Sequence, residues 1–139
     1  MSFEEKGTWI YAVISFIVPG VYFATLIGQI QETPVTEIAY QWPMITAIGV
    51  AVGLSIVAHM AVAIASPKEA DKSDERDTNI NRYGEYIGSF AVYAGALAAL
   101  GLAMAELEHF WIANAIFAGF VLGALTSSAV KLVAYRRGF

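Results

Sequence analysis

The segment Lys68–Arg82, KEADKSDERDTNINR, is the most highly charged stretch of this 139-residue chain. It holds four of the eight Lys/Arg residues and five of the twelve Asp/Glu residues. The sequence on either side of it is long, apolar and almost free of charge. The segment therefore divides the chain into two hydrophobic halves, and each half is long enough to form a helical hairpin in a membrane.

The distribution of charge outside this segment predicts four membrane spans. Asp, Glu, Lys and Arg are absent from positions 7–31, 38–67, 86–105 and 109–130. A helix rises about 1.5 Å per residue, so about 20 apolar residues cross a hydrocarbon core of about 30 Å. A soluble bundle of such helices would need a further layer of protein to cover them, which a chain that is 58% hydrophobic and 14% charged does not supply. We expect a single transmembrane domain with spans at about 9–30, 42–65, 84–105 and 110–134, and a connector at 66–83.

The basic residues predict the orientation of these spans. All eight lie before the first span, in the connector or after the fourth span: Lys6, Lys68, Lys72, Arg76, Arg82, Lys131, Arg136 and Arg137. Cytoplasmic loops carry the excess of Lys and Arg, so both termini and the connector are expected to face the cytoplasm. The first six residues lack the basic region of a signal peptide, so the first span is expected to be retained. The expected fold is an all-α, four-helix transmembrane bundle of the cell membrane.

The connector also contains signals for the start of a helix. Acidic residues favour the first turn of a helix, so Asp74-Glu75-Arg76-Asp77 is expected to open a helix that continues through Tyr83 into the third span. The third helix would then extend into the cytosol. Ser66-Pro67-Lys68-Glu69 has the form of a capping box and predicts a short helical turn before it. The four residues Asp74, Glu75, Arg76 and Asp77 are candidates for contact with a cytosolic partner, although ion pairs within a helix start would explain them as well.

Small residues suggest where helices pack. Gly84, Gly88, Ala91 and Gly95 follow a 4-3-4 spacing that keeps them on one face of the third span. Small residues allow close approach of helices in lipid, either within the chain or between two copies in a homodimer. The second and fourth spans carry shorter versions of the same pattern at Gly49 and Gly53 and at Gly119 and Gly123. Asn114, on the opposite face of the fourth span, is expected to form a hydrogen bond across helices.

An intramembrane polar cluster is the main candidate site. His59 is the one ionisable residue well inside a span, and Glu85, Ser89 and Lys131 lie at a similar depth in their own spans. Such a cluster could form a proton or ligand site in which His59 titrates near neutrality. The alternative is structural: His59 stays neutral beside a neighbour, while Glu85 and Lys131 extend toward the headgroups. Replacement of His59 would distinguish the two.

Other classes of site are excluded or unsupported. The chain has no cysteine, which removes disulfide frameworks, thiolate metal sites and dithiol chemistry. His59 and His109 are expected near opposite membrane faces and cannot hold one haem, and the first span lacks the acidic residue of the small multidrug exporters. No nucleophile–base set, phosphate loop or zinc spacing occurs, and the acidic residues of the outer loops impose no coordination geometry. We therefore expect no enzyme activity, no cofactor, no metal and no nucleic-acid partner.

Four short features together resemble a family of short prokaryotic four-span integral membrane proteins that has no assigned activity. They are Glu5-Lys6-x-x-Trp9, Asp74-Glu75-Arg76-Asp77, Phe110-Trp111-Ile112-Ala113-Asn114 and Tyr135-Arg136-Arg137-Gly138. The resemblance extends over most of the chain. It implies a four-helix integral membrane fold and a prokaryotic source, and it implies no activity.

Two classes of function remain open at this point. The first is a small accessory or regulatory module that interacts with a membrane partner protein or with a second copy. The second is an oligomeric transporter or channel for a small solute or ion, which would use the polar cluster. The spans carry few polar residues to line a continuous path, and this favours the first class. In both cases the lipid bilayer is a partner, and Arg82, Lys131, Arg136 and Arg137 suit anionic headgroups on the cytoplasmic side.

Overall fold

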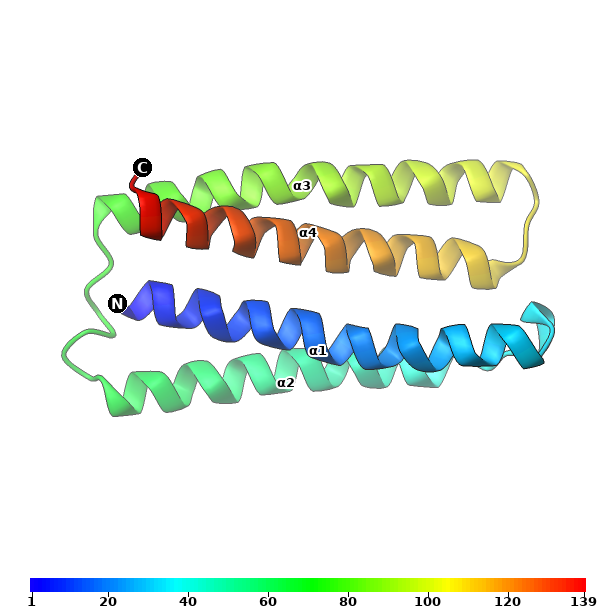
Figure 1. Cartoon of the computed structure of the whole chain (residues 1–139), viewed down its shortest axis with the longest axis horizontal. Helices are drawn as coiled ribbons and strands as arrows, with labels where there is room; N and C mark the ends of the chain where they lie inside the picture. The colour runs from blue at the N-terminus through cyan, green and yellow to red at the C-terminus, as the bar shows by residue number, and fades with distance from the viewer.

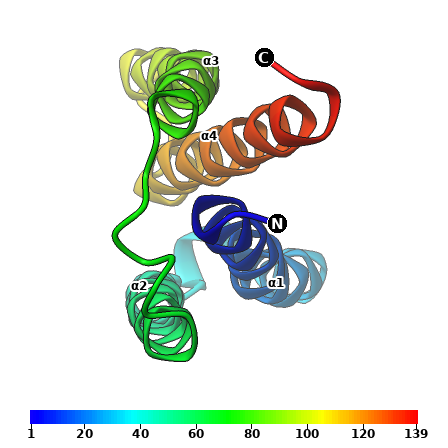
Figure 2. The same ribbon diagram turned by 90° about the vertical axis from the view of Figure 1, so that its left-hand side faces the viewer.

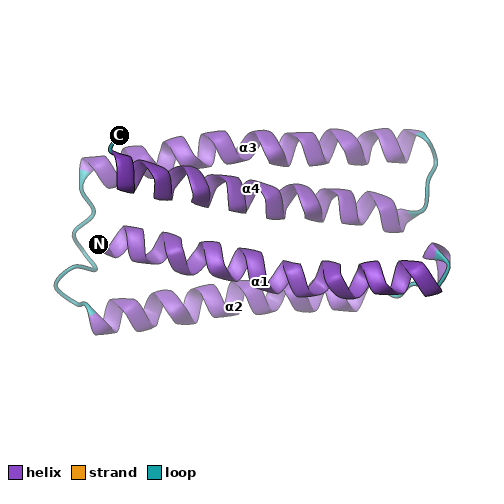
Figure 3. Ribbon diagram, in the orientation of Figure 1, coloured by secondary structure: helices purple, strands orange, loops and turns teal.

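A computed structural model describes all 139 residues, and every regular element in it is helical (Figures 1 and 3). The long helices are α1 (Phe3–Glu32), α2 (Gln41–Ala65), α3 (Glu75–Met104) and α4 (His109–Arg137). A short 3-10 turn, η1 (Val35–Glu37), lies between α1 and α2. Each of the four long helices is long and apolar enough to cross a membrane. The chain is therefore a multi-pass membrane protein with an all-α fold.

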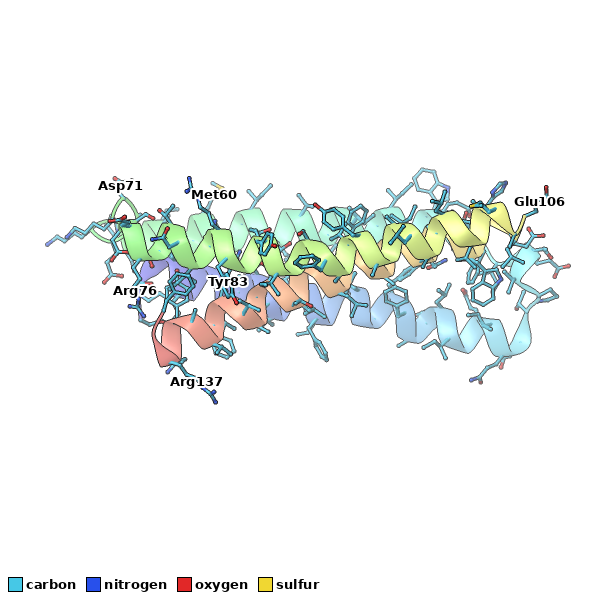
Figure 4. The ribbon with its side chains drawn as sticks, turned by 90° about the horizontal axis from the view of Figure 1, so that it is seen from above. Met60, Asp71, Arg76, Tyr83, Glu106 and Arg137 are labelled. Carbon is cyan, nitrogen blue, oxygen red and sulfur yellow. The ribbon has the colours of Figure 1, made fainter.

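The chain termini and the connector lie at one end of the molecule (Figure 1). Figure 4 shows Asp71, Arg76 and Arg137 at this end and Glu106 at the other. We call the first end, where the termini and residues 66–74 lie, the connector end. All eight Lys and Arg residues therefore lie toward the connector end, whereas the turns 33–40 and 105–108 at the other end carry only acidic charges.

The start of α3 depends on a capping box in the charged segment. The Asp74 carboxylate accepts a hydrogen bond from the Asp77 backbone N–H at 2.8 Å, and the Asp77 carboxylate accepts one from the Asp74 N–H at 3.3 Å. These bonds satisfy donors that have no partner inside the helix. The helix start expected from the acidic run is thus present, but the capping box lies here and not at Ser66. Residues 67–71 form turns outside any helix.

The four helices form an open row. α3 packs closely on α4, α4 packs on α1, and α1 packs on α2, whereas α2 and α3 do not pack against each other. Figure 2, viewed from the connector end, shows α4 and α1 between α3 and α2, with the connector running from α2 to α3. We call the side of the row between α2 and α3 the open side.

Glycines bring the backbones of α3 and α4 together. A Cβ atom added at Gly95 would lie 2.6 Å from the Gly119 Cα, and one added at Gly88 would lie 2.6 Å from the Gly123 carbonyl oxygen. Both separations are shorter than any atom pair tolerates without movement of the backbone. Gly84, one turn nearer the connector end, lies against Ser127 and Lys131 in the same way. These five glycines of α3 and α4 therefore form one seam.

The glycines of the second span do not pack against another helix as expected. Nothing lies within 4 Å of a Cβ placed on Gly49 or Gly53, so these glycines pack against no other helix of the chain. The reason is geometric. α2 faces only α1, and it does so through Ala47, its one buried residue, which lies on a different face of the helix.

Aromatic and aliphatic side chains, rather than glycines, hold α1 to α4 and α2. Tyr22, Leu26, Phe110 and Phe117 are buried together with Ile38 and Ala47. Within this core the Tyr22 hydroxyl donates a hydrogen bond to the Asn114 Oδ1 at 2.6 Å. The expectation that Asn114 bonds across helices is therefore confirmed. The core lies toward the end opposite the connector, which leaves the connector end less tightly packed by apolar groups.

We predict that Gly95→Ala lowers stability, while Gly101→Ala does not. The first change forces a methyl group into the Gly119 backbone, and overpacking of this kind costs about 1–3 kcal/mol. The second lies on the same helix but meets nothing within 4 Å, so it serves as the matched control. The unfolding midpoint of each purified variant is measured by circular dichroism in mixed detergent micelles. Equal unfolding midpoints for the two variants would contradict the glycine seam.

Candidate functional site

Three of the four residues of the expected polar cluster line one cavity at the connector end. The cavity has a volume of about 230 Å³, and every long helix contributes to its wall. His59 comes from α2, Glu85 from α3 and Lys131 from α4, and the first turns of α1 complete it. The α1 residues are Phe3, Glu4, Gly7, Thr8 and Tyr11. Residues that are far apart in the sequence therefore meet in one polar space, which we call the polar cavity.

Glu85 and Lys131 form an ion pair in this cavity. The Lys131 ammonium donates a hydrogen bond to Glu85 Oε1, and the Ser127 hydroxyl donates to the same oxygen at 3.1 Å. The Lys131 side chain is only 11% exposed, whereas that of Glu85 is 65% exposed. Glu85 Oε2 accepts no hydrogen bond from the chain. The pair therefore leaves one carboxylate oxygen available to the cavity.

Gly84 makes this ion pair possible. The stem of Lys131 crosses α3 at Gly84, where any Cβ would collide with the lysine side chain. A long basic side chain can lie along an apolar surface only where that surface leaves room for it. The same glycine seam that joins α3 to α4 thus sets the position of the buried ammonium group.

His59 presents a free ring nitrogen near the cavity. Its Nδ1 lies 2.7 Å from the Ser55 carbonyl oxygen, one turn earlier in α2. A carbonyl oxygen only accepts, so we infer that Nδ1 carries a proton and that Nε2 is an acceptor when the ring is neutral. A Cβ on Gly7 would lie 2.9 Å from that Nε2, so the absence of a side chain at Gly7 leaves space for the imidazole. Sequence reasoning did not single out Gly7.

Ser89 does not join the polar cavity. Its hydroxyl donates to the Tyr86 carbonyl oxygen of its own helix at 2.7 Å. It lines a neighbouring space of about 320 Å³, which also contains Glu85 and Tyr93. The structure thus brings together His59, Glu85 and Lys131, and it places Ser89 beside them rather than among them.

An apolar groove lies beside the polar cavity. It has a volume of about 560 Å³ and lies between α1, α2 and α4. Tyr11 lines both spaces. The groove is walled mainly by apolar side chains, including Ile14, Pro19, Ala51, Phe117 and Phe120. The polar cavity and the apolar groove are therefore neighbours that adjoin at Tyr11.

Polar contacts close the connector end below the cavity. Arg136 Nε lies 3.1 Å from Glu5 Oε1 and joins α4 to α1, and Lys6 Nζ lies 3.2 Å from Glu69 Oε2 and joins α1 to the connector. The Tyr135 hydroxyl donates to Asp77 Oδ1 at 3.0 Å. Burial raises the pKa of the Tyr135 phenol, and the neighbouring carboxylate raises it further. The phenol therefore keeps its proton and its role as donor across the physiological range.

These contacts change the interpretation of the charged segment. Asp74 and Asp77 are occupied by the capping box, and Asp77 is also buried against Tyr135. Asp74, Glu75 and Arg76 are exposed and Asp77 is buried, so three of the four residues of the acidic run are accessible from outside the chain. Arg76 also donates to the Tyr135 carbonyl oxygen at 3.4 Å.

The four basic residues that were expected to contact headgroups fall into two groups, those paired within the chain and those that are exposed. Lys131 and Arg136 are paired with carboxylates inside the chain. Arg82 and Arg137 are exposed and have no acidic partner in the chain, so they are the ones available to anionic headgroups. No group of three or more His, Cys, Asp or Glu side chains is placed to hold a metal ion.

No family model, curated protein or solved structure matches this chain. Its assignment as a four-span membrane protein therefore rests on its helices and their composition, and no family is assigned to it.

A double-mutant cycle tests the ion pair. We predict that Glu85→Gln and Lys131→Met are coupled by about 1 kcal/mol in unfolding free energy, because the ammonium is nearly buried. The exposed pair Lys6 and Glu69 is the matched control, with side chains 35% and 53% exposed, and its coupling should be near zero. The free energy of unfolding is measured in detergent for the parent, the four single variants and the two double variants. Additive effects at Glu85 and Lys131 would show that the two groups do not interact.

Proposed function

We propose that this protein is a non-enzymatic accessory or regulatory module of the cell membrane, which acts by contact with another membrane protein. The open side of the row carries the proposal. α2 packs on a single helix, so the surfaces of α2 and α3 on the open side are left without a partner helix inside the chain. Val52, Ile56 and Tyr93 are exposed there.

The hydroxyl group of Tyr93 adds support. Tyr93 lies near the middle of the expected third span and is 60% exposed. Its hydroxyl makes no hydrogen bond within the chain. A polar group that faces hydrocarbon without a partner is unfavourable, and helices in membranes commonly satisfy such groups by hydrogen bonds to a neighbouring helix. A transmembrane helix of a partner, or of a second copy, would supply an acceptor.

Photo-crosslinking in the native membrane tests the interaction. A crosslinking amino acid at Val52 or Tyr93 is expected to capture the same protein species, identified by mass spectrometry. Phe16 is a matched control, since it is equally apolar and exposed but lines none of the spaces on the open side. The mass of the product distinguishes a second copy from another protein. Capture of lipid alone at all three positions would contradict the proposal.

We also propose that both termini and the connector face the cytoplasm, because all eight basic residues lie at the connector end. The chain has no cysteine, so single cysteines give an unambiguous signal. We predict that a membrane-impermeant maleimide labels Glu106→Cys in intact cells and labels Ser73→Cys only after permeabilisation. The reverse pattern would overturn the orientation.

The polar cavity favours a second candidate, transport of a small solute or ion through an oligomer. Against it stands the apolar groove beside this cavity, whose lining is mainly apolar and offers no continuous polar path. Flux into proteoliposomes decides between the two. Transport that is lost in both His59→Gln and Glu85→Gln would support the second candidate, while absence of flux in the parent protein supports the first.

A further inference from the structure

The polar cavity contains carboxylate oxygens that are free to accept hydrogen bonds. Glu85 Oε2 and the Glu4 carboxylate accept no bond from any side chain or backbone N–H, and His59 Nε2 is a further acceptor when the ring is neutral. The one cationic group of the lining, the Lys131 ammonium, donates to Glu85 Oε1. A ligand that brings N–H donors therefore finds free acceptors in this cavity.

The charge of the lining points in the same direction. Two carboxylates, Glu4 and Glu85, face one ammonium, Lys131, which leaves a net charge of −1 when His59 is neutral. The nearby cations of α1 and α4 do not correct this balance, because Lys6 is paired with Glu69 and Arg136 with Glu5. A cationic group is stabilised in such a space, and an anionic group is repelled. The rings of Phe3 and Tyr11, also in the lining, are surfaces that organic cations favour.

Size and position define the rest of the ligand. At about 230 Å³ the polar cavity holds a headgroup and not a whole molecule. The apolar groove of about 560 Å³ begins at the shared residue Tyr11 and continues along α1. Since α2 and α3 do not pack together, a molecule can enter from the side of the bilayer. The site therefore has a polar end near the membrane surface and an apolar end inside it.

We propose that the polar cavity and the apolar groove together bind an amphipathic amine. Its protonated nitrogen donates to Glu85 Oε2, to the Glu4 carboxylate and to His59 Nε2, and its apolar chain lies in the groove against Phe117 and Phe120. The shared chemistry is an N–H-bearing ammonium on a hydrocarbon chain. It can come from the ethanolamine headgroup of a phospholipid or from a free lipophilic amine. This inference does not depend on the proposed interaction role.

The first experiment compares headgroups on the full-length protein. The purified chain is exchanged into mixed micelles with phosphatidylethanolamine, phosphatidylcholine or phosphatidylglycerol of identical acyl chains, and bound lipid is counted by native mass spectrometry. Phosphatidylcholine carries the same charge but no N–H, and phosphatidylglycerol is anionic. Decylamine and decanol are added as competing free probes that differ only in the ammonium group.

We expect phosphatidylethanolamine or decylamine, or both, to bind about tenfold more tightly than phosphatidylcholine and decanol, which corresponds to the loss of about one good contact. If only decylamine binds, the natural ligand is a free amine and the site stands. If phosphatidylethanolamine binds and decylamine displaces it, the source is a lipid. Equal binding of ethanolamine and choline lipids together with equal binding of decylamine and decanol overturns the proposal, and so does a preference for phosphatidylglycerol.

Two variants are expected to change the affinity for decylamine in opposite directions, which a phosphate-binding site would not do. Glu85→Gln should weaken decylamine binding about tenfold. Lys131→Met should strengthen it, because the competing ammonium is removed from Glu85. Glu75→Gln is the control, since this carboxylate is exposed and lies outside the cavity. Glu4→Gln, in the first turn of α1, should also weaken binding and keeps the test valid if Glu85→Gln fails to fold. Parent-like binding in Glu4→Gln, or loss of binding in Lys131→Met, would refute the assignment.

Discussion

The close contact between the backbones of α3 and α4 is the constraint on which the rest of the structure depends. Inside lipid the hydrophobic effect does not drive helices together, so dispersion contacts and hydrogen bonds must do so. Gly88 and Gly95 on α3 meet Gly123 and Gly119 on α4 at distances that no side chain permits. The seam fixes the relative rotation of the two helices. It thereby places Lys131 over Gly84 and within hydrogen-bonding distance of Glu85.

Packing becomes looser with distance from this seam. α1 joins α4 through bulky side chains and the buried hydrogen bond from Tyr22 to Asn114. α2 joins only α1, and its remaining surface is open. An open row results, because the small residues of α3 already pack on α4. The groove and the polar cavity are consequences of this row, since a closed bundle would bring α2 against α3 and fill both spaces.

Local signals in the sequence predicted the elements well, and long-range contacts were beyond them. Charge-free stretches predict four helices and the acidic run predicts the start of α3, because each depends on neighbouring residues only. Asn114 predicts a bond between helices, but it does not predict that the partner is Tyr22. Gly49 and Gly53 show the limit: the same spacing that forms a seam on α3 packs against nothing on α2, since packing needs a matching partner. The sequence allowed His59, Glu85 and Lys131 to meet, but it could not identify Gly7 or the bond from Tyr135 to Asp77, which joins residues far apart in the chain.

The charged segment and the polar cavity are mechanically connected through α3. The capping box at Asp74 and Asp77 begins a helix that continues without interruption to Glu85, about two turns further on. On the α4 side, Tyr135 and Lys131 are one turn apart, and each bonds to an acidic residue of α3. These two side-chain hydrogen bonds and the glycine seam thus hold α3 against α4. The exposed Glu75 and Arg76 therefore belong to the same uninterrupted helix as Glu85.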